Sequence, residues 1–167
     1  EIHAYLAHQV DPTQPAPVMS AENAAFMRGF DVRPLFEGYT VEGVETTFTY
    51  DVGTGEVQRL PPGTRAYYRT SETVIGGTAD MILRNKKGQW LVVDFKTGLR
   101  VEPPEVNRQL LFFAFCLHKL YGPLTEPVIG RIVFLYDMKI TQQSAVYPRE
   151  QLAGLDIGSS SIKLAEI

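Results

Sequence analysis

The most constraining feature of this sequence is a short apolar run, Leu91-Val92-Val93, that leads directly into Asp94-Phe95-Lys96. A strand with one solvated face alternates apolar and polar residues, whereas a continuous apolar run predicts a strand that is covered on both faces. The chain must therefore supply packing layers above and below this strand. With 167 residues, of which 44% are hydrophobic, it has the length and composition of one globular domain.

The segments on either side of this run provide candidates for both layers. Helical patterns cover residues 2–10, 21–30 and 105–121, and the second of these begins after Ser20, a candidate N-cap. Alternating or apolar runs predict strands at 41–50, 56–60, 66–69, 74–83, 90–95, 129–136 and 145–147, with a helical turn at 148–152. We expect an α/β (α+β) fold in which a mixed central β-sheet is flanked by helices. The expected domain covers residues 1–153, and residues 154–167 form a tail or a short closing helix.

Composition excludes several classes of protein and site. The ordinary apolar fraction and the lack of a short repeat exclude collagen-like, coiled-coil and disordered chains. No apolar run approaches the ~18 residues of a membrane span, so we expect no membrane association. The N-terminus has neither a basic region nor a start methionine, which indicates a chain that continues upstream rather than a signal peptide. The single cysteine, Cys116, excludes an iron–sulfur cluster and favours a buried thiol in a reducing, cytoplasmic compartment.

The charge is distributed unevenly along the chain. The net charge of −3 divides into −7 for residues 1–58, +4 for residues 59–108 and zero for residues 109–167. A solvated face is one explanation of the positive segment, and a surface for a polyanion is the other. The acidic and basic side chains embedded in this segment favour the second explanation.

Asp80, Asp94 and Lys96 are the candidate reactive groups. Asp94 and Lys96 are two residues apart in a strand, so their side chains project from the same face, and Asp80 lies in the hairpin partner of that strand. Two neighbouring carboxylates are costly unless another charge offsets them, and Mg²⁺ prefers carboxylate oxygens. The structural alternative is a surface hairpin in which Asp94 and Lys96 form an ordinary ion pair.

At this point the sequence resembles the PD-(D/E)XK nuclease superfamily, within it the RecB-like exonuclease branch. Gly77-Thr78-Ala79-Asp80 resembles the second motif and Asp94-Phe95-Lys96-Thr97-Gly98 the third. Residues 107–113 resemble the helix that follows, and Ile2-His3-Ala4-Tyr5-Leu6 resembles the helical histidine motif. The resemblance covers residues 41–136 and the first helix, and it implies a restriction-endonuclease-like core.

The resemblance also implies roles for individual residues. His3, Asp80, Asp94 and the main-chain carbonyl of Phe95 would bind Mg²⁺ or Mn²⁺, and Lys96 would be the catalytic lysine. Gln109 would contact DNA or orient the site. Glu45 is similar to an acidic residue near such sites that serves a second metal, and solvent exposure is its alternative role.

The family resemblance is incomplete at two points. Phe113 stands where the family has a tyrosine, so a hydroxyl contact is missing, and the iron–sulfur cysteines of some relatives are absent. The resemblance implies a metal-dependent deoxyribonuclease, an exonuclease by preference, that acts in DNA repair, recombination or phage DNA processing beside a helicase or recombination protein.

The positive segment supplies candidate DNA contacts. Aromatic and basic side chains in one stretch suit phosphate contacts and base stacking on a single strand, although tyrosine pairs in strands are commonly core residues. The candidates are Tyr68, Arg69, Arg100 and Arg108.

Other assignments compete with catalysis. A non-catalytic DNA-binding or scaffolding domain of the same fold is the main alternative. Residues 154–164 resemble the first phosphate loop of actin-like ATPases, but only three residues follow them, so we do not interpret them as an ATP site. His8 and His118 are expected to be structural rather than metal ligands.

Overall fold

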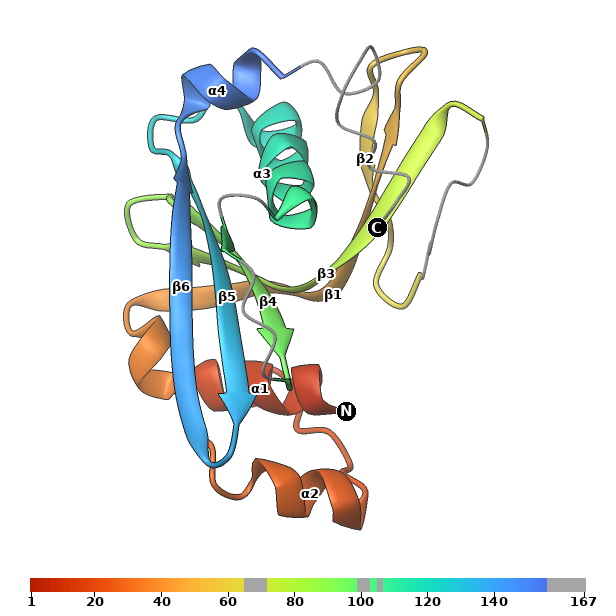
Figure 1. Ribbon diagram of the computed structural model, residues 1–167. Helices are drawn as coiled ribbons and strands as arrows, with labels where there is room; N and C mark the ends of the chain where they lie inside the picture. Colours follow the sequence, from red (N-terminus) through yellow and green to blue (C-terminus); the bar gives the residue numbers. More distant parts are fainter. Residues whose placement is uncertain (65–71, 99–102, 105–106, 156–167) are drawn as a thin grey trace.

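The computed structural model describes residues 1–64, 72–98, 103–104 and 107–155. Six strands form one sheet in the order β2-β1-β3-β4-β5-β6, and helices lie on both of its faces (Figure 1). The elements are α1 (Ile2–Val10), α2 (Ala21–Met27), the 3-10 helix η1 (Arg33–Phe36), β1 (Tyr39–Asp51), β2 (Val57–Arg59), β3 (Val74–Asn85), β4 (Trp90–Lys96), α3 (Arg108–Tyr121), β5 (Val128–Tyr136), β6 (Lys139–Tyr147) and α4 (Arg149–Ala153).

Strand β4 lies inside the sheet and contributes to a separate hydrophobic core on each face. Val92 packs in the core beneath α3 and α4, whereas Leu91 and Val93 pack in the core beneath α1 and η1. All three side chains are fully buried. The continuous apolar run is therefore explained as predicted, because both faces of the strand are covered.

The sheet is mixed, and its single parallel pair follows from one crossover helix. Strands β4 and β5 are parallel because α3 carries the chain from the end of one strand back to the start of the next. The other neighbouring pairs are antiparallel. The expected mixed sheet flanked by helices is confirmed.

Strand β1 turns a sharp corner that directs the β1–β3 arm away from the rest of the sheet (Figure 1). The β1–β3 register shifts between Val41 and Gly43, and Glu45 adopts the left-handed conformation with φ of 46°. A Cβ atom on Gly43 would collide with Oγ1 of Thr46, so glycine suits this corner. Beyond it, β1 and β3 stay paired as far as the Asp51–Val74 pair, and the short strand β2 pairs with the outer edge of β1 in this arm.

Glycine also brings α3 close to this arm. A Cβ atom on Gly77 would lie 3.2 Å from Cε1 of Phe113, which is buried in the core between α3 and the sheet. Phe113 therefore fills a core position, and it packs at 6.1 Å between ring centroids from Phe48. The backbone of β3 therefore approaches α3 closely at Gly77.

Several boundaries differ from the sequence prediction. Helix α2 ends at Met27, with Ser20 capping it as expected through a 3.2 Å bond from the Asn23 N–H, and η1 is separate from it. Strand β6 begins at Lys139, before the predicted start at residue 145. The apolar pattern misses its first part because β6 is an edge strand whose middle side chains are exposed and polar on both faces. The expected strand at 66–69 and most of the 154–167 tail lie outside the described residues.

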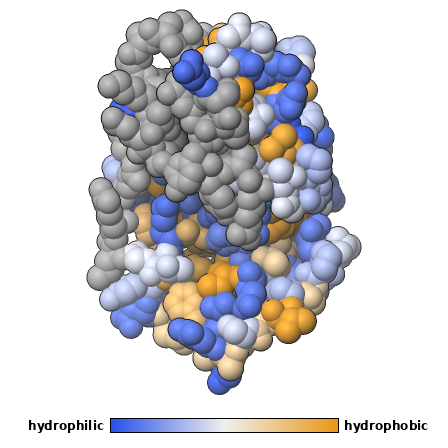
Figure 2. Space-filling model, turned by 90° about the vertical axis from the view of Figure 1, so that its right-hand side faces the viewer, coloured by the Kyte–Doolittle hydropathy of each residue, from blue (hydrophilic) through white to orange (hydrophobic). Residues whose placement is uncertain are grey.

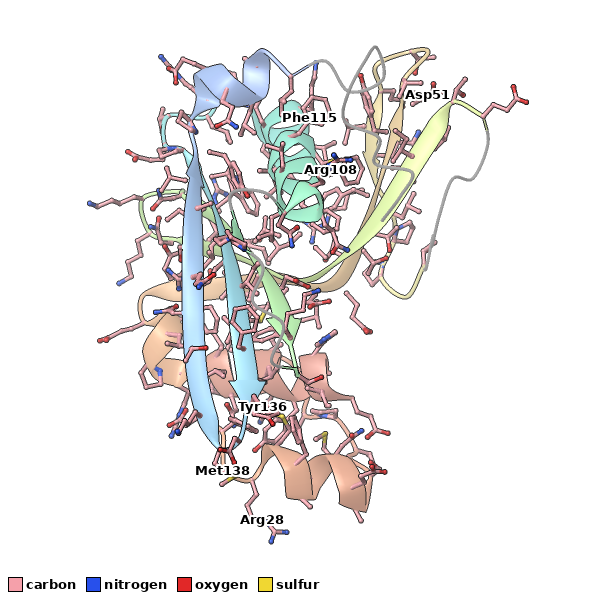
Figure 3. The ribbon with its side chains drawn as sticks, viewed as in Figure 1. Arg28, Asp51, Arg108, Phe115, Tyr136 and Met138 are labelled. Carbon is pink, nitrogen blue, oxygen red and sulfur yellow. The ribbon has the colours of Figure 1, made fainter. Side chains whose placement is uncertain are left out.

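The β5–β6 hairpin packs against the segment that follows α2. Asp137 and Met138, at its tip, both have positive φ, of 50° and 58°. A Cβ atom on Gly29 would collide with the Met138 side chain. Tyr136 and Met138 lie beside α2 at the lower end of the molecule (Figure 3). None of the helices in the described residues is long and apolar enough to cross a membrane.

Candidate metal centre

Asp80 and Asp94 lie where β3 and β4 separate. The last paired residues of the two strands are Met81 and Val93, so Asp80 and Asp94 are the next residues on either side of the fork. Oδ2 of Asp80 accepts a 2.8 Å hydrogen bond from the N–H of Phe95, which replaces a strand-to-strand bond. The fork therefore holds one carboxylate between two strands instead of leaving it in solvent.

Lys96 lies beside Asp94, as the two-residue spacing predicts. Its Nζ is 2.9 Å from Oδ2 of Asp94, and the two side chains are 43% and 14% exposed. The pair is close enough for an ion pair, and this buried oxygen makes no hydrogen bond with a described residue. A buried carboxylate oxygen without a hydrogen bond is a position at which a cation would be stabilised.

The environment of Asp80 disfavours its ionised form. The pKa of the Asp80 carboxyl is raised to about 6: burial is the largest cause and the neighbouring Asp94 adds to the rise, while His3 and the Phe95 N–H oppose it. A carboxyl held in this way becomes an effective metal ligand once a divalent cation offsets its charge.

His3 and Glu45 complete the cluster from two other elements. Helix α1 places the His3 ring between the carboxylates, with Nε2 3.7 Å from Oδ2 of Asp80 and Nδ1 3.5 Å from Oε1 of Glu45. The ring also stacks on Phe95 at 6.1 Å between centroids. Glu45 reaches this position from the corner of β1, where its left-handed backbone is a strained conformation for a residue other than glycine.

The donors in this cluster fit a divalent cation in their chemistry. Carboxylate oxygens and an imidazole nitrogen bind Mg²⁺ or Mn²⁺, and Oδ2 of Asp94, which is paired with the Lys96 ammonium but makes no hydrogen bond with a described residue, offers a ligand position. As placed, the described side chains contain no group of three or more His, Cys, Asp or Glu residues already arranged to hold a metal ion. Binding would therefore require these side chains to turn toward a common point, and the Phe95 carbonyl as a ligand stays a prediction.

The predicted DNA contacts are placed only in part. Arg108 and Gln109 form the first turn of α3, exposed and half-buried respectively, and Figure 3 shows Arg108 projecting from this helix on the side of the β1–β3 arm. Tyr68, Arg69 and Arg100 lie outside the described residues. Figure 2 shows the face toward which the N-terminus points, where hydrophilic and hydrophobic patches alternate below the grey residues.

The two remaining histidines differ from each other. His8 is structural, as expected, because its Nδ1 lies 2.8 Å from the carbonyl oxygen of Gln14. The buried Nδ1 of His118 makes no hydrogen bond with the part of the chain that the structure describes. Cys116 is buried, as predicted, and burial raises the pKa of its thiol.

Comparisons with known proteins identify no family. No family model and no curated protein matches the chain. Among solved structures, one described as the crystal structure of SSO0001 aligns over 79% of this chain and 56% of that chain, with 17% identity and a TM-score of 0.40. The resemblance to PD-(D/E)XK nucleases stays a prediction, and functional reasoning rests on the cluster itself.

Proposed function

We propose that this protein is a divalent-metal-dependent nuclease that hydrolyses DNA phosphodiester bonds. The observation that carries the proposal is the fork between β3 and β4, which holds Asp80, Asp94 and Lys96 together, with Lys96 2.9 Å from Asp94. A structural hairpin would be more stable without a second buried carboxylate, whereas a metal-dependent hydrolase needs both carboxylates and a nearby cationic group.

Each residue of the cluster has a role in this proposal. Asp80, Asp94 and His3 would hold Mg²⁺ or Mn²⁺, and Glu45 would add a carboxylate from the opposite side of the imidazole. When bound, the metal would polarise a phosphoryl oxygen and lower the pKa of a water molecule. The Lys96 ammonium, 43% exposed, is accessible to hold that water or to stabilise charge on the phosphate.

The finer assignments belong to the same proposal. DNA ends are the proposed substrate, and exonuclease action and a helicase or recombination partner follow from the family resemblance alone. The proposed cytoplasmic location follows from the single cysteine. Contacts to the phosphate backbone carry no base information, so we expect little sequence preference.

A non-catalytic DNA-binding or scaffolding domain is the second candidate. The observation that favours it is that the described side chains, as placed, form no ready-made metal group. This candidate predicts a protein that binds DNA without binding Mn²⁺.

The test is a cleavage assay combined with a metal titration. Linear duplex, circular duplex and single-stranded DNA are incubated with Mg²⁺, Mn²⁺ or EDTA, and Mn²⁺ binding is measured by calorimetry. We expect metal-dependent loss of linear DNA, abolished in Lys96→Ala and retained in Lys139→Ala, which removes an exposed lysine at the start of β6.

The outcomes separate the candidates. Cleavage that survives Lys96→Ala would contradict the assigned role of that lysine, and cutting of circles would indicate an endonuclease. Absence of both cleavage and Mn²⁺ binding in a folded protein would refute the enzyme and leave the scaffold.

A further inference from the structure

An arginine–aromatic stack lies on the α3 face of the sheet, and four elements contribute to it. The rings of Trp90 and Tyr121 stack with centroids 4.8 Å apart and an interplanar angle of 21°. The Arg84 guanidinium lies 4.9 Å from the centre of the Trp90 ring. Nη1 of Arg59 donates a 3.1 Å hydrogen bond to the Tyr121 hydroxyl. The chain therefore builds one layered surface from β2, β3, β4 and the end of α3.

The stack is buried at its base and open at Tyr121. Trp90 is 3% exposed, whereas Tyr121 is 41% exposed. The Tyr121 ring is held by Trp90 beneath it and by Arg59 at its hydroxyl, so it loses little further freedom when another ring packs against it. A fixed, exposed aromatic ring is a platform on which a planar group can stack.

The two arginines are positioned by main-chain carbonyls. Nη2 of Arg59 donates to the Glu42 carbonyl at 2.7 Å, and Nε of Arg84 donates to the Gly88 carbonyl at 3.4 Å. A guanidinium carries five N–H donors. These contacts with described residues use two donors of Arg59 and one of Arg84, which leaves donors for a ligand such as a phosphate.

The surrounding charge is positive. The exposed Lys86 and Lys87 lie in the turn that follows Arg84, and the exposed Glu42 is the acidic residue beside Arg59. Stacking rings flanked by cations bind single-stranded nucleic acid without sequence preference, because every base has a flat face and every nucleotide a phosphate.

We propose that this stack is a binding surface for single-stranded nucleic acid, with a base packed on Tyr121 and phosphates bound by Arg59 and Arg84. Trp90 and Asp94 lie on the same face of β4, four residues or about 13 Å apart along the strand. The surface thus deepens the proposed nuclease function, on which the choice of DNA as the strand rests, by adding a contact outside the metal cluster.

The test measures binding without cleavage. A fluorescein-labelled 15-nucleotide oligo-dT is titrated with protein in EDTA at low salt, and anisotropy gives the dissociation constant. Trp90 is the single tryptophan of the chain, so quenching of its emission reports events at the stack. Tyr121→Ala should weaken binding about tenfold, Arg59→Met and Arg84→Met should also weaken it, and Tyr121→Phe should leave it nearly unchanged. Tyr136→Ala is the matched control, because Tyr136 is 44% exposed but lies at the β5–β6 tip.

The outcomes decide between this surface and other functions. Equal affinity for Tyr121→Ala and Tyr136→Ala, or no binding by the unmodified protein, would overturn the proposal. A concentration-dependent dimer that Tyr121→Ala disrupts, without oligonucleotide binding, would assign the surface to a protein contact and also overturn it. Tyr121-dependent binding in a folded protein that neither cleaves DNA nor binds Mn²⁺ would support this surface and refute the nuclease. Cleavage without Tyr121-dependent binding would support the nuclease and overturn this binding surface.

Discussion

Asp80 makes the folded protein less stable at neutral pH than at acidic pH, and Asp80→Asn tests this cost. The pKa of this carboxyl is raised from the ordinary 3.8 to about 6, chiefly by burial. Because the folded-state pKa is the higher one, the stabilising contribution of the group is complete below pH 4 and is lost as the pH rises through 6.

The size of the effect follows from the difference between the two pKa values. The difference is about 2, and each pKa unit corresponds to about 1.4 kcal/mol, so ionised Asp80 costs about 3 kcal/mol above pH 7. Asparagine carries no charge, and its side-chain oxygen can still accept the hydrogen bond of the Phe95 N–H. The variant should therefore be more stable than the unmodified protein by about 2–3 kcal/mol at pH 7.5, and close to it in stability at pH 4.

The assay is urea unfolding in EDTA at pH 4 and pH 7.5, with the free energy of unfolding compared between variant and unmodified protein at each pH. Glu37→Gln is the control, because it removes an exposed carboxylate. A variant less stable than the unmodified protein at pH 7.5, or a difference that does not change with pH, would refute the reasoning. Added Mn²⁺ should stabilise the unmodified protein more than Asp80→Asn, because binding to the folded state alone raises its stability.

Three further substitutions test other parts of the structure. Glu45→Gly should raise the free energy of unfolding in EDTA by about 1 kcal/mol, because glycine adopts positive φ without strain. The same variant should weaken Mn²⁺ binding in calorimetry. A loss of stability would contradict the inferred backbone strain at Glu45. Gly77→Ala should cost about 1–3 kcal/mol in urea unfolding because its Cβ meets Phe113. Gly98→Ala, whose Cβ would meet no described atom within 4 Å, should be neutral, and equal effects would refute this packing. Asn107→Ala should cost about 1–2 kcal/mol by removing the buried 2.9 Å cap of the Leu110 N–H, and Ser20→Ala, at an exposed cap, should cost less in the same denaturation series.

The parts of the fold that follow from local pattern were predictable. The apolar run at 91–93 predicts a covered strand, and the spacing of Asp94 and Lys96 predicts their proximity, because alternation in a strand is a local rule. The 3.2 Å hydrogen bond by which Ser20 caps α2 was also predictable from local sequence. These features depend on a few neighbouring residues and not on the rest of the chain.

Other features depend on tertiary context and were not predictable. The left-handed backbone of Glu45 occurs at a residue that does not favour it, so only the corner of β1 explains it. Strand β6 carries polar residues on both faces because it lies at an edge. The stack of Trp90 and Tyr121 joins a strand start to a helix end 31 positions later in the sequence, a pairing that no periodicity reveals.

The division of the interior into two cores has a consequence for how the molecule opens. His3 belongs to α1, whose buried residues pack in one core, while α3 packs in the other, and the sheet lies between them. The α1 layer can therefore detach as a local unfolding unit while the α3 layer stays intact, as hydrogen exchange resolves in many domains. A cation that bridges His3 on α1 to the carboxylates on the sheet would hold α1 in place and raise the free energy of its local unfolding. Amide exchange in α1 should then slow with added Mn²⁺, while exchange in α3 stays unchanged.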